Sequence, residues 1–409
     1  QAELRKAQLS EIADIEFSCV FAIADIELTG IKIDKDRLSS YSAEIEKQVL
    51  TYQDKLNSFV KNAVVQQTFF GPPETQTINF NSMKQVLDFL NENGIMVTDT
   101  SQYSLSKYST HPIVIALKEY RKAYKLYSGF LDSLPEHIKK ETSRIHASYS
   151  QIGAYSGRMS CRNPNMQQIP RDNQVRDLFT PEKGYQFIIA DYSQVELRVA
   201  ADIAKDDRMI KAYKENLDLH KLTASLITDT PVDSVTKEQR QAAKAVNFGL
   251  IFGMGSKGLQ DYAHDTYNID ITLDQADQFK NQYFKAYTGI KKWHDSLKAN
   301  PPDSARSLTG RRYFYNSQTG FSSYCNTPVQ GSAADILKNA LGHLYQVIKG
   351  TDTHIIAVIH DEIILECKEE KCEKMKILLK NIMENSSKDF LLSVPMVADV
   401  VIARSWAEK

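Results

Sequence analysis

The sequence predicts an α+β protein with short apolar strands and long amphipathic helices. Two apolar runs with strand character, 354–359 and 363–365, flank a short charged turn, and a third run lies at 187–190. Heptad-like helical patterns run from 38 to 60 and from 113 to 134. Strands joined by a tight turn pair antiparallel, and their combination with separate long helices favours the α+β class.

The composition is that of a globular protein. The chain has 409 residues, of which 42% are hydrophobic, so we expect two or three domains with sizeable cores. No apolar run approaches the ~20 residues of a membrane span and no signal segment is recognised, so we expect a soluble protein without a membrane partner. The five cysteines form no C-x-x-C pair, which indicates neither a disulfide framework nor a zinc site.

The first chemical cluster begins where the strand at 187–190 ends. Asp191 is placed to face a cleft, although an acid in this position is about as often a turn residue as a metal ligand. Ser193 and Glu196 have the S-x-x-E spacing of a capping box. This spacing predicts that the strand leads straight into a helix carrying Glu196 in its first turn.

A second cluster, His360-Asp361-Glu362, forms the predicted charged turn between two apolar strands. Acids at a hairpin tip are usually just solvated. A tip lying beside Asp191 would instead bring two carboxylates together, which suits a two-metal site because Mg²⁺ prefers one or two carboxylates plus substrate phosphates. For Glu362, a plain turn carboxylate and a residue near the metals remain about equally supported.

The third cluster combines cations and aromatic rings on one helix. Arg240, Lys244, Phe248 and Phe252 recur every four residues and therefore share one slowly precessing stripe. A stripe that only packed in a core would not begin with Arg and Lys. A helix that binds a nucleoside triphosphate needs cations over the phosphates and flat apolar surface against the base.

These clusters, DYSQVELR from Asp191, RQAAKAVNFGLIFG from Arg240 and HDE from His360, resemble motifs A, B and C of family A DNA polymerases, the group that includes bacterial DNA polymerase I. The stretch 156–170 is similar to the family's GR…PNLQNIP segment, and 326–335 resembles its N-x-P-x-Q-G-x-A-A-D stretch. Several motifs in the correct order are far more specific than one short motif.

The resemblance implies a right-hand polymerase with an antiparallel-sheet palm, a helical thumb and helical fingers. It assigns the palm to 1–38, 144–205 with motif A and 323–409 with motif C, the thumb to 39–143 and the fingers to 206–322. Within the thumb, 71–73 and the helix cap at 79–82 mark a predicted tip.

The resemblance also implies a DNA-directed DNA polymerase that adds deoxynucleoside triphosphates to a primer 3′ end by two-metal-ion nucleotidyl transfer. Two Mg²⁺ ions, with Mn²⁺ as a substitute, would be held by Asp191, Asp361 and the backbone carbonyl of Tyr192. Lys244 would protonate the departing pyrophosphate, and Glu196 would block a ribose 2′-hydroxyl. The catalytic candidates are Asp191, Arg240, Lys244, Asp361 and Glu362; the nucleotide-binding candidates are Gln194, Glu196, His220, Arg240, Lys244, Phe248 and Phe252.

The other expected partner is primer–template DNA. Arg158 and Gln330 resemble residues that hydrogen-bond the minor-groove edge of the terminal base pair, where every correct pair offers acceptors. A stretch rich in Lys, Arg and Tyr, 118–140, matches a thumb helix that grips the duplex backbone. The DNA-binding candidates are Arg121, Lys125, Arg158, Asn165, Gln168, Asn326, Gln330 and His360.

Two positions depart from the family pattern. Phe252 stands where a tyrosine is usual, and Ser322 stands where several members carry an arginine that contacts DNA. The D-x-E sequences at 14–16 and 25–27 echo a proofreading exonuclease signature, but they lie on a helix-like apolar pattern, so we expect no exonuclease in this chain.

Two other functional classes remain open. A single-subunit RNA polymerase shares the aspartates and the cationic helix, but the HDE triplet and Glu196 favour a DNA polymerase. A non-catalytic nucleic-acid clamp would have lost a metal acid, whereas Asp191 and Asp361 are both present. We expect a monomer in the cytoplasm, associated with the nucleoid, with an organelle or a phage-infected cell as alternative locations.

Overall fold

The computed structural model describes residues 2–60, 65–66, 74–75 and 78–409. The chain divides into two compact units, one formed by Gln1–Lys32 with Lys139–Lys409 and the other by Ile33–Ile138. Residues 71–73, which were predicted to mark a thumb tip, lie outside the described residues.

The first unit is built on a four-stranded sheet with the strand order β10-β11-β7-β12, in which every neighbouring pair is antiparallel. The strands are β7 (Tyr185–Tyr192), β10 (His354–Ile359), β11 (Glu362–Lys368) and β12 (Ala398–Ala403). The three predicted strands are confirmed, and β7 and β11 extend beyond the predicted bounds. Most side chains of β7, β10 and β11 are buried, which explains their continuous apolar sequences.

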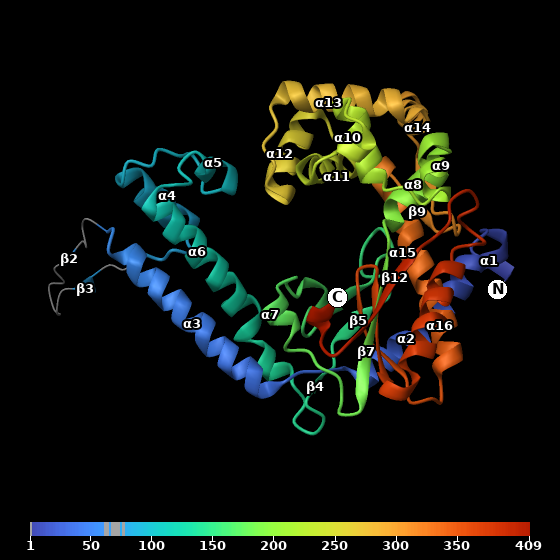
Figure 1. Ribbon diagram of the computed structural model, residues 1–409, viewed down its shortest axis with the longest axis horizontal. Coiled ribbons are helices and arrows are strands. Elements are labelled where there is room, and N and C mark those ends of the chain that lie inside the picture. Colours follow the sequence, from blue (N-terminus) through green and yellow to red (C-terminus); the bar gives the residue numbers. More distant parts are fainter. Residues whose placement is uncertain (1, 61–64, 67–73, 76–77) are drawn as a thin grey trace. The chain divides into compact units, whose positions relative to one another are not determined.

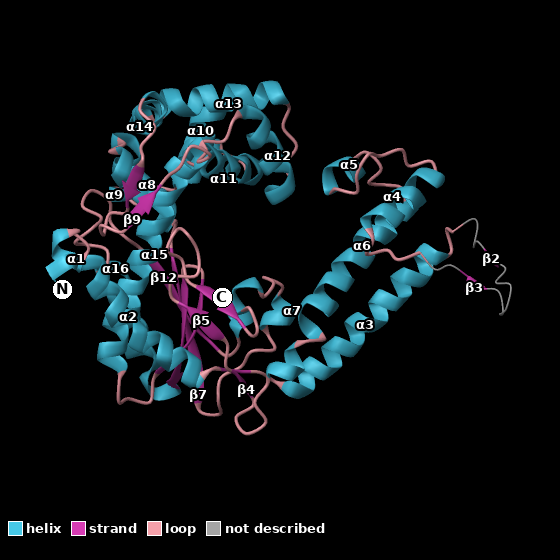
Figure 2. Ribbon diagram, turned by 180° about the vertical axis from the view of Figure 1, so that it is seen from behind, coloured by secondary structure: helices cyan, strands magenta, loops and turns pink. Residues whose placement is uncertain are grey.

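Helices cover this sheet on both sides. The long helices α2 (Ser10–Thr29), α15 (Phe321–Ile348) and α16 (Cys372–Asn385) lie on one side, and the short helix α7 (Asn173–Arg176) lies on the other (Figures 1 and 2). α2 packs on α15 and β10, and α16 packs on β7 and β12. The sheet edge that carries Asp191 therefore belongs to a well-packed core.

A second group of helices follows β7 in the same unit and forms the upper part of Figure 1. Two of its helices begin with a full capping box, Thr236 with Gln239 and Thr272 with Gln275, which satisfies otherwise unpaired backbone amides. The helices are α8 (Val195–Ala204), α9 (Asp207–Lys214), α10 (Leu219–Thr228), α11 (Lys237–Ile251), α12 (Ser256–Tyr267), α13 (Leu273–Ala286) and α14 (Thr288–Ala299).

Small two-stranded sheets complete the first unit. β1 (Ile31–Lys32) pairs with β4 (Arg144–Ile145), β5 (Ser148–Ser150) with β6 (Ser160–Arg162), and β8 (Ser304–Arg306) with β9 (Arg312–Phe314). The remaining short elements of this unit are the helix α1 (Ala2–Lys6) and the 3₁₀ turns Met166–Gln168, Val232–Ser234, Glu369–Lys371 and Trp406–Glu408; a further 3₁₀ turn, Leu134–His137, belongs to the second unit.

The second unit is mainly helical. Its helices are α3 (Lys35–Asn57), α4 (Met83–Glu92), α5 (Gln102–Ser106) and α6 (Pro112–Leu126), which continues into a π-helical turn at Tyr127–Leu131; β2 (Val65–Gln66) pairs with β3 (Glu74–Thr75). α3 and α6 cover most of the two predicted helical patterns. Ser82 caps α4 as predicted, because its side chain accepts from the amide of Gln85. Among the described residues, no helix is long and apolar enough to cross a membrane.

We predict that the stability of the first unit is most sensitive to substitution in the inner strand β7. Ile189 of β7 is buried between β11 and β12, so Ile189→Ala should lower the free energy of unfolding by about 2–5 kcal/mol. Ile377→Ala, at a position of α16 that is 62% exposed, is the control and should change it by less than about 0.5 kcal/mol. Urea denaturation measures both, and equal effects would contradict this packing.

Candidate active site

The acidic centre lies at the end of the sheet where β7 stops and β10 turns into β11. β7 and β11 pair so that Asp191 is opposite Glu362, and the Tyr192 amide donates to the Asp361 carbonyl oxygen at 3.3 Å. Asp361 lies in the two-residue turn after β10, where His360 adopts a left-handed φ of 59°. The antiparallel sheet thus brings Asp191 and Asp361 to one edge, although they are far apart in the sequence.

The charge on these two acids is not fully compensated. Burial, and then the negative charge of Asp191, raise the pKa of Asp361 to about 7. Two neighbouring carboxylates in a partly desolvated site resist ionising together. A bound cation would relieve this repulsion, so the pair is predisposed to hold one.

Glu362 occupies a different position from the one predicted. It is not in the turn; it is the first residue of β11, and it is 3% exposed. Its carboxylate accepts from Trp406 Nε1 at 2.8 Å and from Lys409 Nζ, and Lys409 Nζ also donates to Asp191 Oδ2 at 2.7 Å. The turn interpretation of Glu362 was wrong because the antiparallel ladder extends one step further toward Asp191. No sequence motif marked Lys409, which only the tertiary structure brings to these acids.

The donor set at this edge fits Mg²⁺. Among the residues that the structure describes, no three His, Cys, Asp or Glu side chains converge as a metal cage. Asp191, Asp361 and the Tyr192 carbonyl instead offer two carboxylates and one backbone oxygen. Mg²⁺ commonly uses few protein oxygens, keeps several waters and takes the remaining ligands from substrate phosphates.

The cationic stripe lies on α11 and faces the N-terminus of α10. Arg240 Nε donates to Asp218 Oδ2 at 2.7 Å, and Asp218 also caps α10 by accepting from the Lys221 amide. Lys244 follows one turn after Arg240 and is partly exposed. α11 ends at Ile251, so Phe252 is its C-cap residue and not, as predicted, a helical continuation of the stripe.

His220 and Phe248 lie on the same two helices, α10 and α11. The His220 ring lies 6.0 Å from the Phe248 ring between centroids, and Asn247 Nδ2 is 3.0 Å from His220 Nδ1. Burial lowers the pKa of His220 to about 4, so its imidazole is neutral near pH 7. A neutral ring here offers hydrogen bonding without adding charge to that of Arg240 and Lys244.

One pocket is lined by both Asp361 and Phe248 of α11. Its volume is about 240 Å³, and it is lined by residues from the β7–α8 connection, α11, α15 and the β10–β11 turn. A neighbouring pocket of about 300 Å³ contains Asp191, Glu362 and Lys409. Four residues line both pockets: Gln167, Arg171, His360 and Asp361.

Two of them, Gln167 and Arg171, were not among the predicted site residues. Gln167 lies inside the 156–170 motif stretch, and Arg171 directly follows it. The predicted residues in the first pocket are Arg158, Gln194, Glu196, Phe248, His360 and Asp361.

The predicted capping box at the start of α8 does not form. The N-cap is Gln194, which has a left-handed φ of 56° and makes no side-chain cap hydrogen bond, and the Ser193 amide donates instead to Val397 O. The carboxylate of Glu196 pairs with Arg158 at the pocket, and burial raises its pKa although Arg158 opposes this shift. The strand-to-helix turn is too tight for Ser193 to serve as the cap.

The other DNA-binding candidates lie on two supports beside the pocket. Asn165 caps the 3₁₀ turn that contains Gln168, because its side-chain oxygen accepts from the Gln167 amide at 3.1 Å. Asn326 and Gln330 lie one turn apart on α15. The side-chain oxygen of Asn326 is buried without a hydrogen-bond partner, so it can still accept one.

Arg121 and Lys125 belong to the second unit. Both lie on α6, where the Arg121 guanidinium donates to Thr100 O at 2.8 Å and to Thr100 Oγ1 at 3.0 Å. Arg121 therefore ties α6 to the segment before α5 and is only partly exposed, whereas the Lys125 side chain is exposed.

Comparison with known proteins agrees with this geometry. The profile of DNA polymerase family A matches residues 35–408. DNA polymerase I of Aquifex aeolicus is 33% identical over 98% of this chain, and that of Caldicellulosiruptor bescii is 31% identical over 97%. The chain spans 68% of the Aquifex protein but only 47% of the Caldicellulosiruptor protein.

A solved structure shares the fold. The POL domain of Pol1 from M. smegmatis, in complex with DNA primer-template and dNTP, superimposes with a TM-score of 0.87 at 28% identity. The match covers 99% of this chain and 72% of the other. It confirms the predicted α+β polymerase fold, and together with the profile and the relatives it confirms the predicted family: the chain belongs to family A of the DNA polymerases.

Proposed function

We propose that this chain catalyses the template-directed addition of deoxynucleoside triphosphates to a primer 3′ end by two-metal-ion nucleotidyl transfer. The observation that carries the proposal is the convergence of Asp191 and Asp361 at one sheet edge, where the pKa of Asp361 is raised to about 7 and the pocket also contains Phe248 of α11. An acidic pair whose charge Lys409 compensates only in part, next to a cation-bearing helix, suits a substrate that arrives as a metal-bound triphosphate.

Asp191, Asp361 and the Tyr192 carbonyl would hold Mg²⁺, or Mn²⁺ in its place. Held by these residues, the ions would supply Lewis-acid activation of the primer 3′-hydroxyl and charge neutralisation at the transferring phosphate. Lys409 bonds both Asp191 and Glu362, but Glu362 is also buried and accepts from Trp406 Nε1, so we assign Glu362 to fixing this end of the sheet and Asp191 and Asp361 to the ions.

The α10–α11 surface would bind the incoming nucleotide. Arg240, held by Asp218, and Lys244 would contact the phosphates, and Lys244 would supply the proton for pyrophosphate. His220 would add a neutral hydrogen-bonding group. Phe248 and Phe252 would offer apolar surface to the nucleotide and the template base. Gln194 and Glu196 would lie beside the sugar, and Glu196 would exclude a 2′-hydroxyl.

Each unit, taken by itself, carries residues that we propose contact DNA. In the first unit, Arg158 and Gln330 would reach the minor-groove edge of the terminal pair. In the second unit, we propose Lys125 as a backbone contact, because the Arg121 guanidinium is already engaged by Thr100. The other proposed contacts of the first unit are Asn165, Gln168, Asn326 and His360.

We propose that the residues of Ile33–Ile138 form the thumb and those from α9 to α14 the fingers. The relatives named above are bacterial, so we place the enzyme in the bacterial cytoplasm, where it would act as a monomer on DNA.

Removing either metal acid should abolish catalysis. Asp191→Ala or Asp361→Ala should slow nucleotide addition by about 10³-fold or more, because several kcal/mol of transition-state stabilisation is lost. Primer extension with Mg²⁺ measures the rate, and gel-shift titration should show that DNA binding persists. Asp352→Asn is the control, since Asp352 forms ion pairs with Lys368 and Lys371 at the protein surface. A fully active Asp191→Ala variant would refute the metal assignment.

Metal binding should depend on pH. Because the pKa of Asp361 is raised to about 7, a proton competes with the metal below that pH and the carboxylate is free above it. The affinity for Mg²⁺, measured by calorimetry on DNA-free protein, should therefore fall up to about tenfold per pH unit below 7. Asp361→Asn should remove this dependence, whereas Asp352→Asn should keep it. A transition near pH 4 in the unsubstituted protein would contradict the raised pKa.

Glu196 should set the preference for deoxyribose. Glu196→Ala opens space in the pocket beside Phe248, so the ratio of deoxynucleotide to ribonucleotide incorporation should fall by about tenfold or more. Glu196→Gln keeps the size of the side chain while removing its charge, and it should retain most of the ratio if exclusion is steric. Single-nucleotide incorporation kinetics distinguish the two variants, and an unchanged ratio in Glu196→Ala would reject this role.

A further inference from the structure

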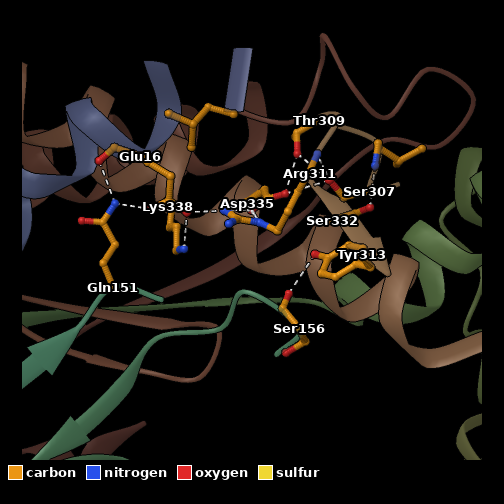
Figure 3. Close-up of polar contacts among 12 residues, drawn as sticks. Glu16, Gln151, Ser156, Ser307, Thr309, Arg311, Tyr313, Ser332, Asp335 and Lys338 are labelled. Carbon is orange, nitrogen blue, oxygen red and sulfur yellow. Dashed lines mark hydrogen bonds and ion pairs between the residues drawn. The ribbon is translucent and has the colours of Figure 1, made fainter. Parts of the chain in front are cut away.

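A buried polar network lies beside the pocket, which one of its members, Lys338, helps to line. It joins Glu16 of α2, Asp335 and Lys338 of α15, and Arg311 of the turn between β8 and β9 (Figure 3). Two acids and two bases make this network neutral, and Asp335 and the Lys338 side chain are fully buried. Buried ionic groups of this kind stabilise only when every member is paired, and in that case they fix one geometry.

Asp335 anchors the β8–β9 turn, Ser307–Arg311, to α15. Its carboxylate accepts from Ser307 Oγ at 2.9 Å and Thr309 Oγ1 at 2.5 Å on one oxygen, and from Arg311 Nε at 2.9 Å on the other. The Leu308 amide adds a bond to Ser332 Oγ at 2.8 Å. The turn therefore cannot shift along α15 without breaking several bonds to buried groups.

Glu16 connects the same network to the loop Gln151–Arg158, called here the 151–158 loop. Lys338 Nζ donates to Glu16 Oε1 at 2.6 Å, and Arg311 Nη2 bonds the same oxygen. Gln151 Nε2 donates to the Glu16 backbone oxygen at 2.7 Å and to its carboxylate. One end of the loop is thus tied to α2 and α15.

Tyr313 holds the other end of the 151–158 loop. Its hydroxyl donates to Ser156 O at 2.9 Å, and it passes directly over Gly331 of α15. A Cβ on Gly331 would lie 1.9 Å from that hydroxyl, so only glycine leaves room for this bond. Tyr155 adds a hydrogen bond from its hydroxyl to Phe314 O.

The Arg311 side chain also packs against the 151–158 loop, at Gly157. Its φ is +84°, and a Cβ there would lie 2.7 Å from Arg311 Nε. The amides of Gly153 and Ala154 both donate to Arg158 O at 3.1 Å, which closes the loop on the residue that carries the exposed guanidinium. The backbone that carries Arg158 is therefore held by contacts of the 151–158 loop with Glu16, Tyr313 and Arg311.

We infer that Tyr313 and Arg311 are positioning residues for Arg158, and that the β8–β9 turn is a clamp that sets where its guanidinium can meet the terminal base pair. This inference rests on the proposed function, in which Arg158 contacts the minor-groove edge of that pair. Neither Tyr313 nor Arg311 lines the pocket that contains Arg158 and Asp361, so they act through the loop and not on the substrate. Gly157 and Gly331 are the two small residues that permit the clamp to close.

Tyr313→Phe is the test, because it removes the bond to Ser156 O and keeps the ring. A matched primer end uses the Arg158 contact and a mispaired end does not. We therefore expect the ratio of matched to mismatched extension, each measured as kcat/KM, to fall about fivefold, the effect of one lost hydrogen bond. In an Arg158→Ala background, the same substitution should leave the ratio unchanged, since the two changes act on one contact.

Tyr120→Phe is the control. It removes the hydroxyl of a buried tyrosine in the second unit, which accepts a hydrogen bond from Asn81 Nδ2 at 3.2 Å. It should change the melting temperature about as much as Tyr313→Phe and leave the ratio unaltered. An unchanged ratio in Tyr313→Phe, an equal slowing of matched and mismatched ends, or an additive effect with Arg158→Ala would each overturn the inference. If the unsubstituted chain extends no primer, the proposed function fails first, and the inference fails with it.

Discussion

The register between β7 and β11 is the constraint on which the site depends. It places Asp191 opposite Glu362 and the Asp361 turn directly beyond them. Because side chains alternate along a strand, a slip of one residue would turn Asp191 to the other face of the sheet. The register is held by the buried apolar residues of both strands and by the tight turn at His360, so packing in the core fixes the chemistry at its edge.

The electrostatics of the site follow from that arrangement. Sheet pairing forces Asp361 close to Asp191 in a partly buried place, and the resulting rise in the pKa of Asp361 is a free-energy cost that a cation can remove. Lys409 pairs with Asp191 and Glu362, Arg240 pairs with Asp218, and burial keeps His220 neutral at pH 7. The pocket combines Asp361 with two lining cations, Arg158 and Arg171, which suits a metal-bound polyphosphate.

Helix α15 contributes residues both to the pocket and to the buried network. Ala333, Ala334 and Leu337 line the pocket, and Gln330 precedes them in the same helix. Asp335 and Lys338 of that helix belong to the buried network beside the pocket. Three acids of the D-x-E echoes are also structural: Glu16 belongs to this network, Asp25 accepts from the Ile355 amide, and Glu27 accepts from the Tyr149 amide. Helix α15 thus packs on α2 and also carries residues that we propose contact DNA.

The sequence by itself determined the family, the fold class, the main strands and helices, and the acids that meet at the sheet edge, because these depend on local periodicity and on motifs with fixed spacing. It misplaced Glu362 and the cap of α8 by one or two residues, since ladder length and turn geometry depend on strand pairing. Lys409, Arg171 and the Glu16–Arg311–Asp335–Lys338 network carry no local signal. Only the tertiary structure decided them, because each is defined by contacts between segments that the chain brings together when it folds.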